Sequence, residues 1–231
     1  MRQRLLSLDA LKTQEMGGGN NGNGGGNNGG SINGHDYVDL GLPSGLLWAA
    51  CNIGAAAPED HGDYFAWGET EAKDIYNFST YKHGGPMSLK KYCNNSHCGF
   101  YGFTDDLTTL QPDDDVASTN WGGNWRMPTR EEWDELLNNT NDIWTTQDGV
   151  KGRLFTASNG ASLFLPVAGY REDGYLYHGD RNGFYQSSSL YVDQPSIAWQ
   201  LYFDGGSGFM LNQAPRASGL SVRAVCPAIK N

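Results

Sequence analysis

The sequence predicts an α+β fold, because helical and strand patterns occur in different parts of the chain. Residues 127–139 have helical spacing, whereas the last third alternates apolar and polar residues in short runs separated by Gly-rich turns. Few helices beside several short strands are typical of α+β domains, and the strands are expected to pair antiparallel. We therefore expect short antiparallel sheets and two helices.

The size and the charge of the chain limit the classes of protein to which it can belong. A chain of 231 residues can bury one core of ordinary size. The 16 Lys and Arg against 26 Asp and Glu give a net charge of -10, which repels phosphate groups. No stretch approaches the roughly 20 apolar residues that span a bilayer. We therefore expect no nucleic-acid partner and no membrane insertion.

The beginning of the chain differs from the rest. In residues 1–16, Leu5, Leu8 and Leu11 recur at helical spacing. This short segment could dock and form a homo-oligomer, and terminal disorder explains it equally well. Residues 17–34 contain ten Gly and six Asn, a composition typical of a flexible linker. The folded domain is expected to cover residues 35–231.

The first half of that domain contains two predicted strands and two predicted helices. Residues 37–40 and 46–50 are short apolar runs joined by a Gly- and Pro-containing turn. Thr129 and Glu132 form a capping box before a helix that runs to Asn139. Pro58 predicts a shorter helix that runs toward Tyr64 and ends by residue 68.

The last third contains the clearest strand patterns. Trp199, Leu201 and Phe203 alternate with Gln200 and Tyr202, so a strand here would bury the first set and expose the second. Residues 220–226 alternate in the same way, which predicts that Ser221 and Arg223 face solvent. Residues 163–165 and 184–189 are further strand candidates.

Several ordered motifs resemble a known family. They are Tyr37-Val38-Asp39-Leu40-Gly41-Leu42-Pro43-Ser44-Gly45, Asp63-Tyr64-Phe65-Ala66-Trp67-Gly68-Glu69, Asn120-Trp121-Gly122-Gly123-Asn124-Trp125-Arg126-Met127-Pro128-Thr129, Ser187-Ser188-Ser189, Ala198-Trp199 and Gly219-Leu220-Ser221-Val222-Arg223. Over about residues 35–226 they resemble the Fibrobacter succinogenes major paralogous domain, a family common in gut Bacteroidetes. The resemblance implies a C-type lectin-like fold, related to the formylglycine-generating enzyme.

A narrower resemblance covers about residues 170–225. This region is similar to the variable region of proteins diversified by retroelements, in which codons for solvent-facing positions are randomised on a retained framework. The framework matches are Ser187 to Ser189, Ala198, Trp199, Leu201, Phe203, Arg216, Gly219, Ser221, Val222 and Arg223. The matching variable positions are Tyr185, Gln186, Tyr191, Asp193, Ser196, Ile197, Gln200, Tyr202, Phe209, Leu211, Asn212, Gln213, Ala214, Ala217 and Ser218. Gln186 stands where the family pattern has Trp.

The residue types at these positions favour recognition. Tyr175 and Tyr177 precede the variable positions and join their aromatic residues as candidate contacts. Tyrosine provides large, rigid contact area at low entropic cost, and Ser, Asn and Gln provide adaptable hydrogen bonds. The alternative is that these aromatic residues fill the core.

Catalytic and metal sites have weaker support. There is no G-x-S-x-G nucleophile elbow, and Cys93, His97 and Cys98 lack a nearby fourth zinc ligand. The segment Gln111-Pro112-Asp113 resembles the sugar- and calcium-binding tripeptide of galactose-type lectins, and Asp114 and Asp115 add oxygen ligands. The Trp-Asn-Asp partner motif of those lectins is missing. We expect no enzyme activity, no metal site and no cofactor.

These observations predict a ligand-binding protein that displays a retroelement-diversified surface to a host-surface protein or glycan. Charged residues interrupt the apolar run that follows Arg4, so no signal peptide is expected. Synthesis in the cytoplasm and placement on a phage tail, another part of a virion, or a cell surface are expected. The alternatives are a bacterial adhesin or lectin of the same fold, and a formylglycine-generating-like oxidase.

Overall fold

The structure is a computed structural model that describes residues 28–206 and 209–228. In this part of the chain four small antiparallel sheets accompany two α-helices, α1 (Val116–Trp121) and α2 (Arg130–Asn139). Two short 3-10 helices are also present, η1 (Phe100–Gly102) and η2 (Pro112–Asp114). The mixed composition and the antiparallel pairing agree with the predicted α+β class.

The N-terminal sheet contains β1 (Gly29–Ile32), β2 (His35–Asp39), β3 (Leu46–Ala49) and β12 (Val225–Pro227), in that order. Strands β2 and β3 confirm the first two predicted strands. Strand β1 shows that the predicted linker, residues 17–34, extends too far. Its hairpin to β2 turns at Asn33 and Gly34, which both have positive φ, as Asn-Gly turns do. Residues 1–27, including the proposed docking segment, lie outside the described residues.

Helix α2 begins as predicted. The Thr129 hydroxyl accepts a hydrogen bond from the Glu132 backbone N–H, and the Glu132 carboxylate accepts one from the Thr129 backbone N–H. This capping box satisfies backbone donors that the first turn leaves unpaired. Trp133 and Leu136 are buried on the side of the helix that faces the core.

The predicted helix at residues 58–68 is wrong. The Asp60 carboxylate accepts hydrogen bonds from the backbone N–H groups of Ala56 and Ala57, which holds the chain in a turn. Gly62 has φ +69, outside the helical region. The second helix is instead α1, where the Asp115 side chain caps the N–H groups of Ala117 and Ser118.

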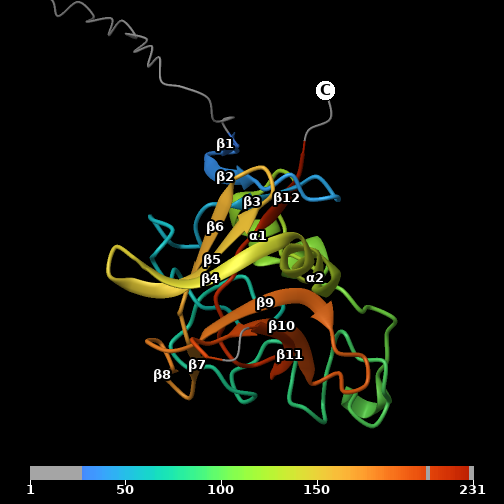
Figure 1. Cartoon of the computed structure of the whole chain (residues 1–231). Helices are drawn as coiled ribbons and strands as arrows, with labels where there is room; N and C mark the ends of the chain where they lie inside the picture. Colours follow the sequence, from blue (N-terminus) through green and yellow to red (C-terminus); the bar gives the residue numbers. More distant parts are fainter. Residues whose placement is uncertain (1–27, 207–208, 229–231) are drawn as a thin grey trace, which may run out of the picture.

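Two further sheets lie below the first in Figure 1, with α2 beside them. The middle sheet contains β4 (Thr140–Gln147), β5 (Val150–Ala157) and β6 (Ser162–Pro166). The C-terminal sheet has the order β11 (Phe209–Pro215), β10 (Ile197–Phe203), β9 (Gly183–Leu190). The hairpin of β7 (Tyr170–Glu172) and β8 (Tyr175–Tyr177) lies beside the C-terminal sheet (Figure 1).

The main core lies between these elements. Trp48, Trp133, Phe155, Leu201 and Phe203 belong to one cluster of buried residues that joins β3, α2, β5 and β10. Burial of such large side chains contributes about 1.5–3 kcal/mol each to the free energy of unfolding. The core therefore fixes α2 against the inner face of the C-terminal sheet.

The predicted alternation at residues 220–226 is wrong. Ser221 and Arg223 are completely buried, and only residues 225–227 form a strand. The Arg223 guanidinium donates hydrogen bonds to the Asn52 side chain and to the carbonyl oxygens of Ala49 and Ala50. These distant acceptors pair with two of the three guanidinium nitrogens, and Nη2 has no hydrogen-bond partner among the described residues. A local sequence pattern does not reveal such acceptors for a buried charge.

The longest helix among the described residues is α2, which has ten residues. Neither α1 nor α2 combines the length and the apolar character that crossing a bilayer requires.

Candidate functional site

The C-terminal sheet has two chemically different faces. In β10, Leu201 and Phe203 point into the main core, where Leu211 of β11 also packs. Gln200 directly precedes Leu201, pairs with Asn212 across the strands, and lines a cavity on the opposite face. Gln200 and Leu201 therefore point to opposite faces, as the alternation predicts, but Gln200 is only 4% exposed, so its predicted exposure to solvent is wrong.

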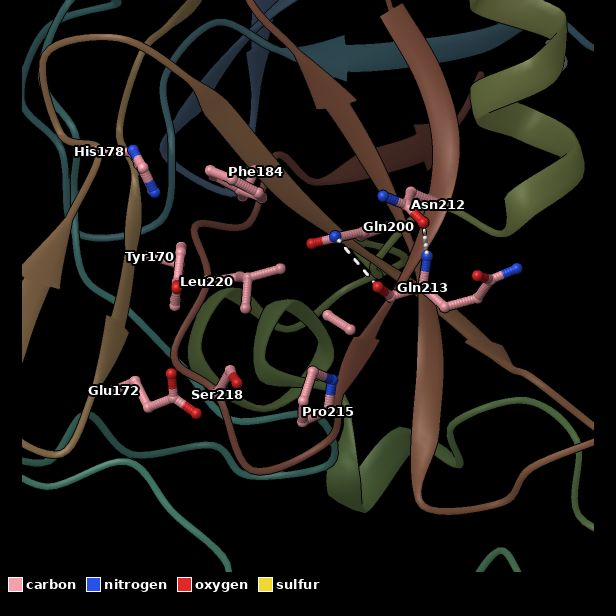
Figure 2. Close-up of a pocket in the computed structure, with 11 residues that line it drawn as sticks. Tyr170, Glu172, His178, Phe184, Gln200, Asn212, Gln213, Pro215, Ser218 and Leu220 are labelled. Carbon is pink, nitrogen blue, oxygen red and sulfur yellow. Dashed lines mark hydrogen bonds between the residues drawn. The ribbon is translucent and has the colours of Figure 1, made fainter.

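The cavity has a volume of about 410 Å³. Figure 2 shows its lining residues converging from the C-terminal sheet, from the β7–β8 hairpin and from the segment after β11. These residues are Tyr170, Glu172, His178, Phe184, Gln200, Asn212, Gln213, Ala214, Pro215, Ser218 and Leu220. Its volume lies within the range of about 300–1,000 Å³ found for small-molecule sites.

Aromatic rings form one wall of the cavity. The ring centroids of Tyr170 and Phe184 are 5.1 Å apart, and the two rings meet at 71°. Tyr202 extends this wall, with its centroid 5.1 Å from that of Phe184. Tyr177 stacks on Tyr170 at 5.4 Å and Tyr175 lies next to Tyr177, so the wall continues onto the exposed hairpin. Such a surface offers rigid contact area for a ligand.

Hydrogen bonds fix Tyr202. Its hydroxyl donates to the Asp204 carboxylate at 3.1 Å and accepts a hydrogen bond from the Asn182 side-chain amide at 3.0 Å. Burial and the hydrogen bond to Asp204 both raise the pKa of Tyr202. The ring is therefore held in place as a neutral phenol before any ligand arrives.

Polar groups form the rest of the lining. The Gln200 side-chain Nε2 donates to the Gln213 carbonyl oxygen at 3.4 Å, and the Gln213 N–H donates to the Asn212 side-chain oxygen at 2.8 Å. Figure 2 shows both contacts. The Gln200 Oε1 atom is buried and has no hydrogen-bond partner among the described residues. The cavity thus contains an acceptor that no described part of the chain satisfies.

The structure distributes the predicted binding residues among three environments. Those that line the cavity are Gln200, Asn212, Gln213, Ala214 and Ser218. Those that are exposed or half-buried outside it are Tyr175, Tyr177, Tyr191, Asp193, Ile197, Tyr202 and Leu211. Those that are buried outside it are Tyr185, Gln186, Ser196 and Ala217. Phe209 begins β11, but its side chain lies outside what the structure describes.

The buried group corrects the prediction at those four positions. Tyr185 is completely buried, and its hydroxyl donates to the Pro166 carbonyl oxygen at 2.8 Å. The Gln186 amide donates to the carbonyl of Phe65 in the interior, and Ala217 packs in a small cluster of buried tyrosines. Ser196 is 6% exposed. None of these four side chains can offer a ligand much surface in this conformation.

Trp199 is also placed differently from the prediction. The β9–β10 pairing shifts register between Ala198 and Gln200, and Trp199 in this interval is half-buried instead of buried. The Arg130 guanidinium lies 4.3 Å from its ring centroid, and Tyr191 contacts it edge-on at 5.2 Å. Trp199 therefore lies at the margin of the core.

Six lining residues were not among the predicted contacts: Tyr170, Glu172, His178, Phe184, Pro215 and Leu220. A local signal existed for Tyr170 and Glu172. Asp173-Gly174 follows them, both residues have positive φ, and Asp-Gly is a strong hairpin turn signal. Because positions two apart in a strand share a face, that hairpin would have placed Tyr170 and Glu172 together.

The other candidate sites have structural explanations. Asp114 pairs with Lys82 and Lys91 and accepts a hydrogen bond from Tyr92, while Asp115 caps α1. These carboxylates are therefore occupied by the protein itself. All four cysteines are free thiols, and burial raises the pKa of Cys51, Cys93 and Cys226. The described ranges contain no group of three or more His, Cys, Asp or Glu side chains that could hold a metal ion.

Comparisons of the chain with protein-family models, with curated proteins and with solved structures found no match.

Proposed function

We propose that this chain is a ligand-binding protein whose recognition surface is the outer face of the C-terminal sheet together with the β7–β8 hairpin. The observation that carries this proposal is the cavity, in which five predicted contact residues from β10, β11 and the following turn meet an aromatic wall. Shape, aromatic surface and an unsatisfied buried acceptor are features of binding sites.

The arrangement also suits diversification. Asn212, Gln213 and Ala214 are half-buried neighbours on β11, and Leu201 and Phe203 belong to the core on the other side of the sheet. Surface substitutions usually change stability by less than about 0.5 kcal/mol, whereas core truncations cost several kcal/mol. A retroelement that changed only the outer positions would leave the fold intact.

The wider proposal follows from the sequence motifs. We place the chain among proteins with a C-type lectin-like scaffold, with a phage tail or other virion component that recognises a host-surface protein or glycan as the setting. In this proposal the domain has no enzyme activity.

Two libraries test the proposal. The first randomises Tyr202, Asn212, Gln213 and Ala214, and the matched control library randomises the same number of core positions, including Tyr185, Leu201 and Phe203. We expect most clones of the first library to express and melt cooperatively and to yield binders against immobilised proteins or glycans. Equal loss of folded clones in both libraries would contradict the proposal.

The DNA that flanks the gene tests the retroelement. We expect a reverse-transcriptase gene and a near-copy of the segment that encodes residues 170–225, with differences at adenines. If complete flanking sequence contains neither feature, the retroelement is ruled out. An adhesin that uses the same surface without diversification would then explain the observations better.

A further inference from the structure

The floor of the cavity contains a hydrogen-bond acceptor that lacks a donor among the residues that the structure describes. Gln200 is only 4% exposed, and its Nε2 faces the Gln213 carbonyl oxygen, which can only accept. This contact fixes the amide orientation and directs Oε1 toward the side of the cavity formed by Phe184 and Tyr170 (Figure 2). An unpaired buried acceptor has lost its hydrogen bonds to water without gaining one from the protein, which has a cost in free energy. A ligand that donates a hydrogen bond here would remove that cost.

The wall of the cavity contains one carboxylate, that of Glu172. Glu172 is half-buried at the end of β7, and no salt bridge to it exists among the described residues. Figure 2 shows its carboxylate beside Ser218 and below Tyr170. Burial raises the pKa of Tyr170, and the negative charge of Glu172 raises it further. The lining therefore contains one carboxylate and no lysine or arginine, so its charge attracts a cation.

Aromatic faces add to the same preference. Tyr170 and Phe184 meet at 71°, so they form a corner with two π surfaces. A cation near such a face is stabilised by the ring quadrupole, and more strongly where water is excluded. His178 lies close to both rings, with centroids 6.1 Å and 6.4 Å away, and is exposed to solvent. The protein thus places acceptors and π faces around one small space.

We propose, on the basis of the binding function proposed above, that this cavity receives a cationic side chain, a lysine ammonium or an arginine guanidinium, from a protein ligand. Both groups only donate hydrogen bonds, which matches Gln200 Oε1 and the Glu172 carboxylate. The net charge of -10 favours approach of a basic surface. A single carboxylate supplies too few oxygen ligands for a hard metal ion, so an organic cation fits better.

The test uses the full chain and small probes. N-acetyl-lysine methylamide and N-acetyl-arginine methylamide are titrated against the ¹⁵N-labelled protein, with N-acetyl-norleucine methylamide and N-acetyl-citrulline methylamide as neutral counterparts. We expect saturable shifts of the side-chain amides of Gln200 and Asn212 with at least one cationic probe. The neutral counterparts should bind about tenfold more weakly or not at all, because charged hydrogen bonds and cation–π contacts are lost.

Variants separate charge at the site from charge in general. Glu172→Gln should weaken binding of the cationic probe by about tenfold, because a neutral amide replaces the carboxylate that pairs with the cation. Glu71→Gln removes an exposed carboxylate that lines a different cavity, and it should leave the affinity unchanged. A melting curve for each variant shows that it is folded.

Several outcomes would overturn this inference. Equal binding of the neutral probes, equal effects of Glu172→Gln and Glu71→Gln, or saturable binding of a methyl glycoside in place of the cations would each do so, and the last would assign the cavity to a glycan. If the library randomised at Tyr202, Asn212, Gln213 and Ala214 yields binders while the cationic probes do not bind, only the proposal of a cationic ligand is wrong. If that library yields no binders, the proposed function fails as well.

Discussion

Gln200 and Leu201 are neighbours in β10 whose side chains lie on opposite faces of the C-terminal sheet. Leu201 is fully buried in the main core, whereas Gln200 lines the cavity and pairs across the strands with Asn212. The same stretch of chain therefore stabilises the fold with one side chain and presents a hydrogen-bonding group with the next. This relationship separates the effects expected from substitutions on the two faces.

Truncation of these two residues should have unequal effects on stability. Leu201→Ala leaves a void in a well-packed core and should lower the free energy of unfolding by about 2–5 kcal/mol. Gln200→Ala removes one long hydrogen bond and an unsatisfied acceptor, so a loss below about 1 kcal/mol is expected. Urea denaturation of both variants measures the difference. Equal losses would show that Gln200 is a core residue.

Tyr185 should behave as a core residue although the family resemblance placed it among the variable positions. Tyr185→Ala should lower the free energy of unfolding by about 3–5 kcal/mol, because the ring is fully buried. Tyr185→Phe keeps the ring and leaves the Pro166 carbonyl oxygen without its donor, so a loss of about 1–3 kcal/mol is expected. Thermal or urea unfolding of the two variants gives these values. If Tyr185→Ala left the free energy of unfolding unchanged, that result would contradict the burial of this side chain.

Local signals predicted the elements that local interactions determine. Thr129 and Glu132 are three residues apart, and their capping box forms without help from the rest of the chain. The alternation in β10 likewise predicted which way Gln200 and Leu201 point. Sequence neighbours alone were sufficient for these features.

Other features depend on residues that are distant in sequence. Tyr185 is buried because its hydroxyl meets Pro166 and Asn52, and Asn52 lies 133 residues away. The register shift beside Trp199 arises from pairing with β9, so the alternation within β10 did not reveal it. The cavity itself requires the β7–β8 hairpin to meet β10 and β11. Only the folded chain brings these groups together.

Arg216 should be among the least replaceable residues of the domain. Its guanidinium is fully buried and donates hydrogen bonds to the Tyr81 hydroxyl and to the carbonyl oxygens of Lys91, Tyr92 and Pro195. Arg216→Ala leaves these acceptors without donors and should cost about 3 kcal/mol or more.

A lysine at this position should not restore the stability. Lysine has a single ammonium and cannot reproduce a planar fork that reaches four acceptors, so Arg216→Lys should remain clearly destabilised. The control is Arg181→Ala, because the Arg181 side chain is exposed and pairs with the exposed Asp180 carboxylate at 3.7 Å. It should change the free energy of unfolding by less than about 0.5 kcal/mol. Denaturation curves of the three variants measure these changes in the free energy of unfolding. Full stability of Arg216→Lys would contradict the role of the guanidinium hydrogen bonds.

Asp114 should make the stability of the domain sensitive to acid. Burial alone would raise the pKa of this carboxyl group, but hydrogen bonds from Lys91, Lys82 and Tyr92 outweigh burial and lower the pKa to about 2. Because the pKa is lower in the folded state than the ordinary value of 3.8, folding favours the ionised form. The resulting stabilisation is complete above about pH 5 and is lost as the pH falls toward 2.

This linkage gives a measurable pH profile. The difference in free energy of unfolding between the wild type and Asp114→Asn should be constant near neutral pH and should shrink by about 2 kcal/mol between about pH 5 and pH 2. Urea denaturation over that range measures it, and Asp106→Asn, which changes an exposed carboxylate, is the control. A carbon NMR titration of the Asp114 carboxyl group should show an inflection near pH 2. An inflection near pH 4, or a difference that does not depend on pH, would mean that the lysines do not hold this carboxylate in its ionised form.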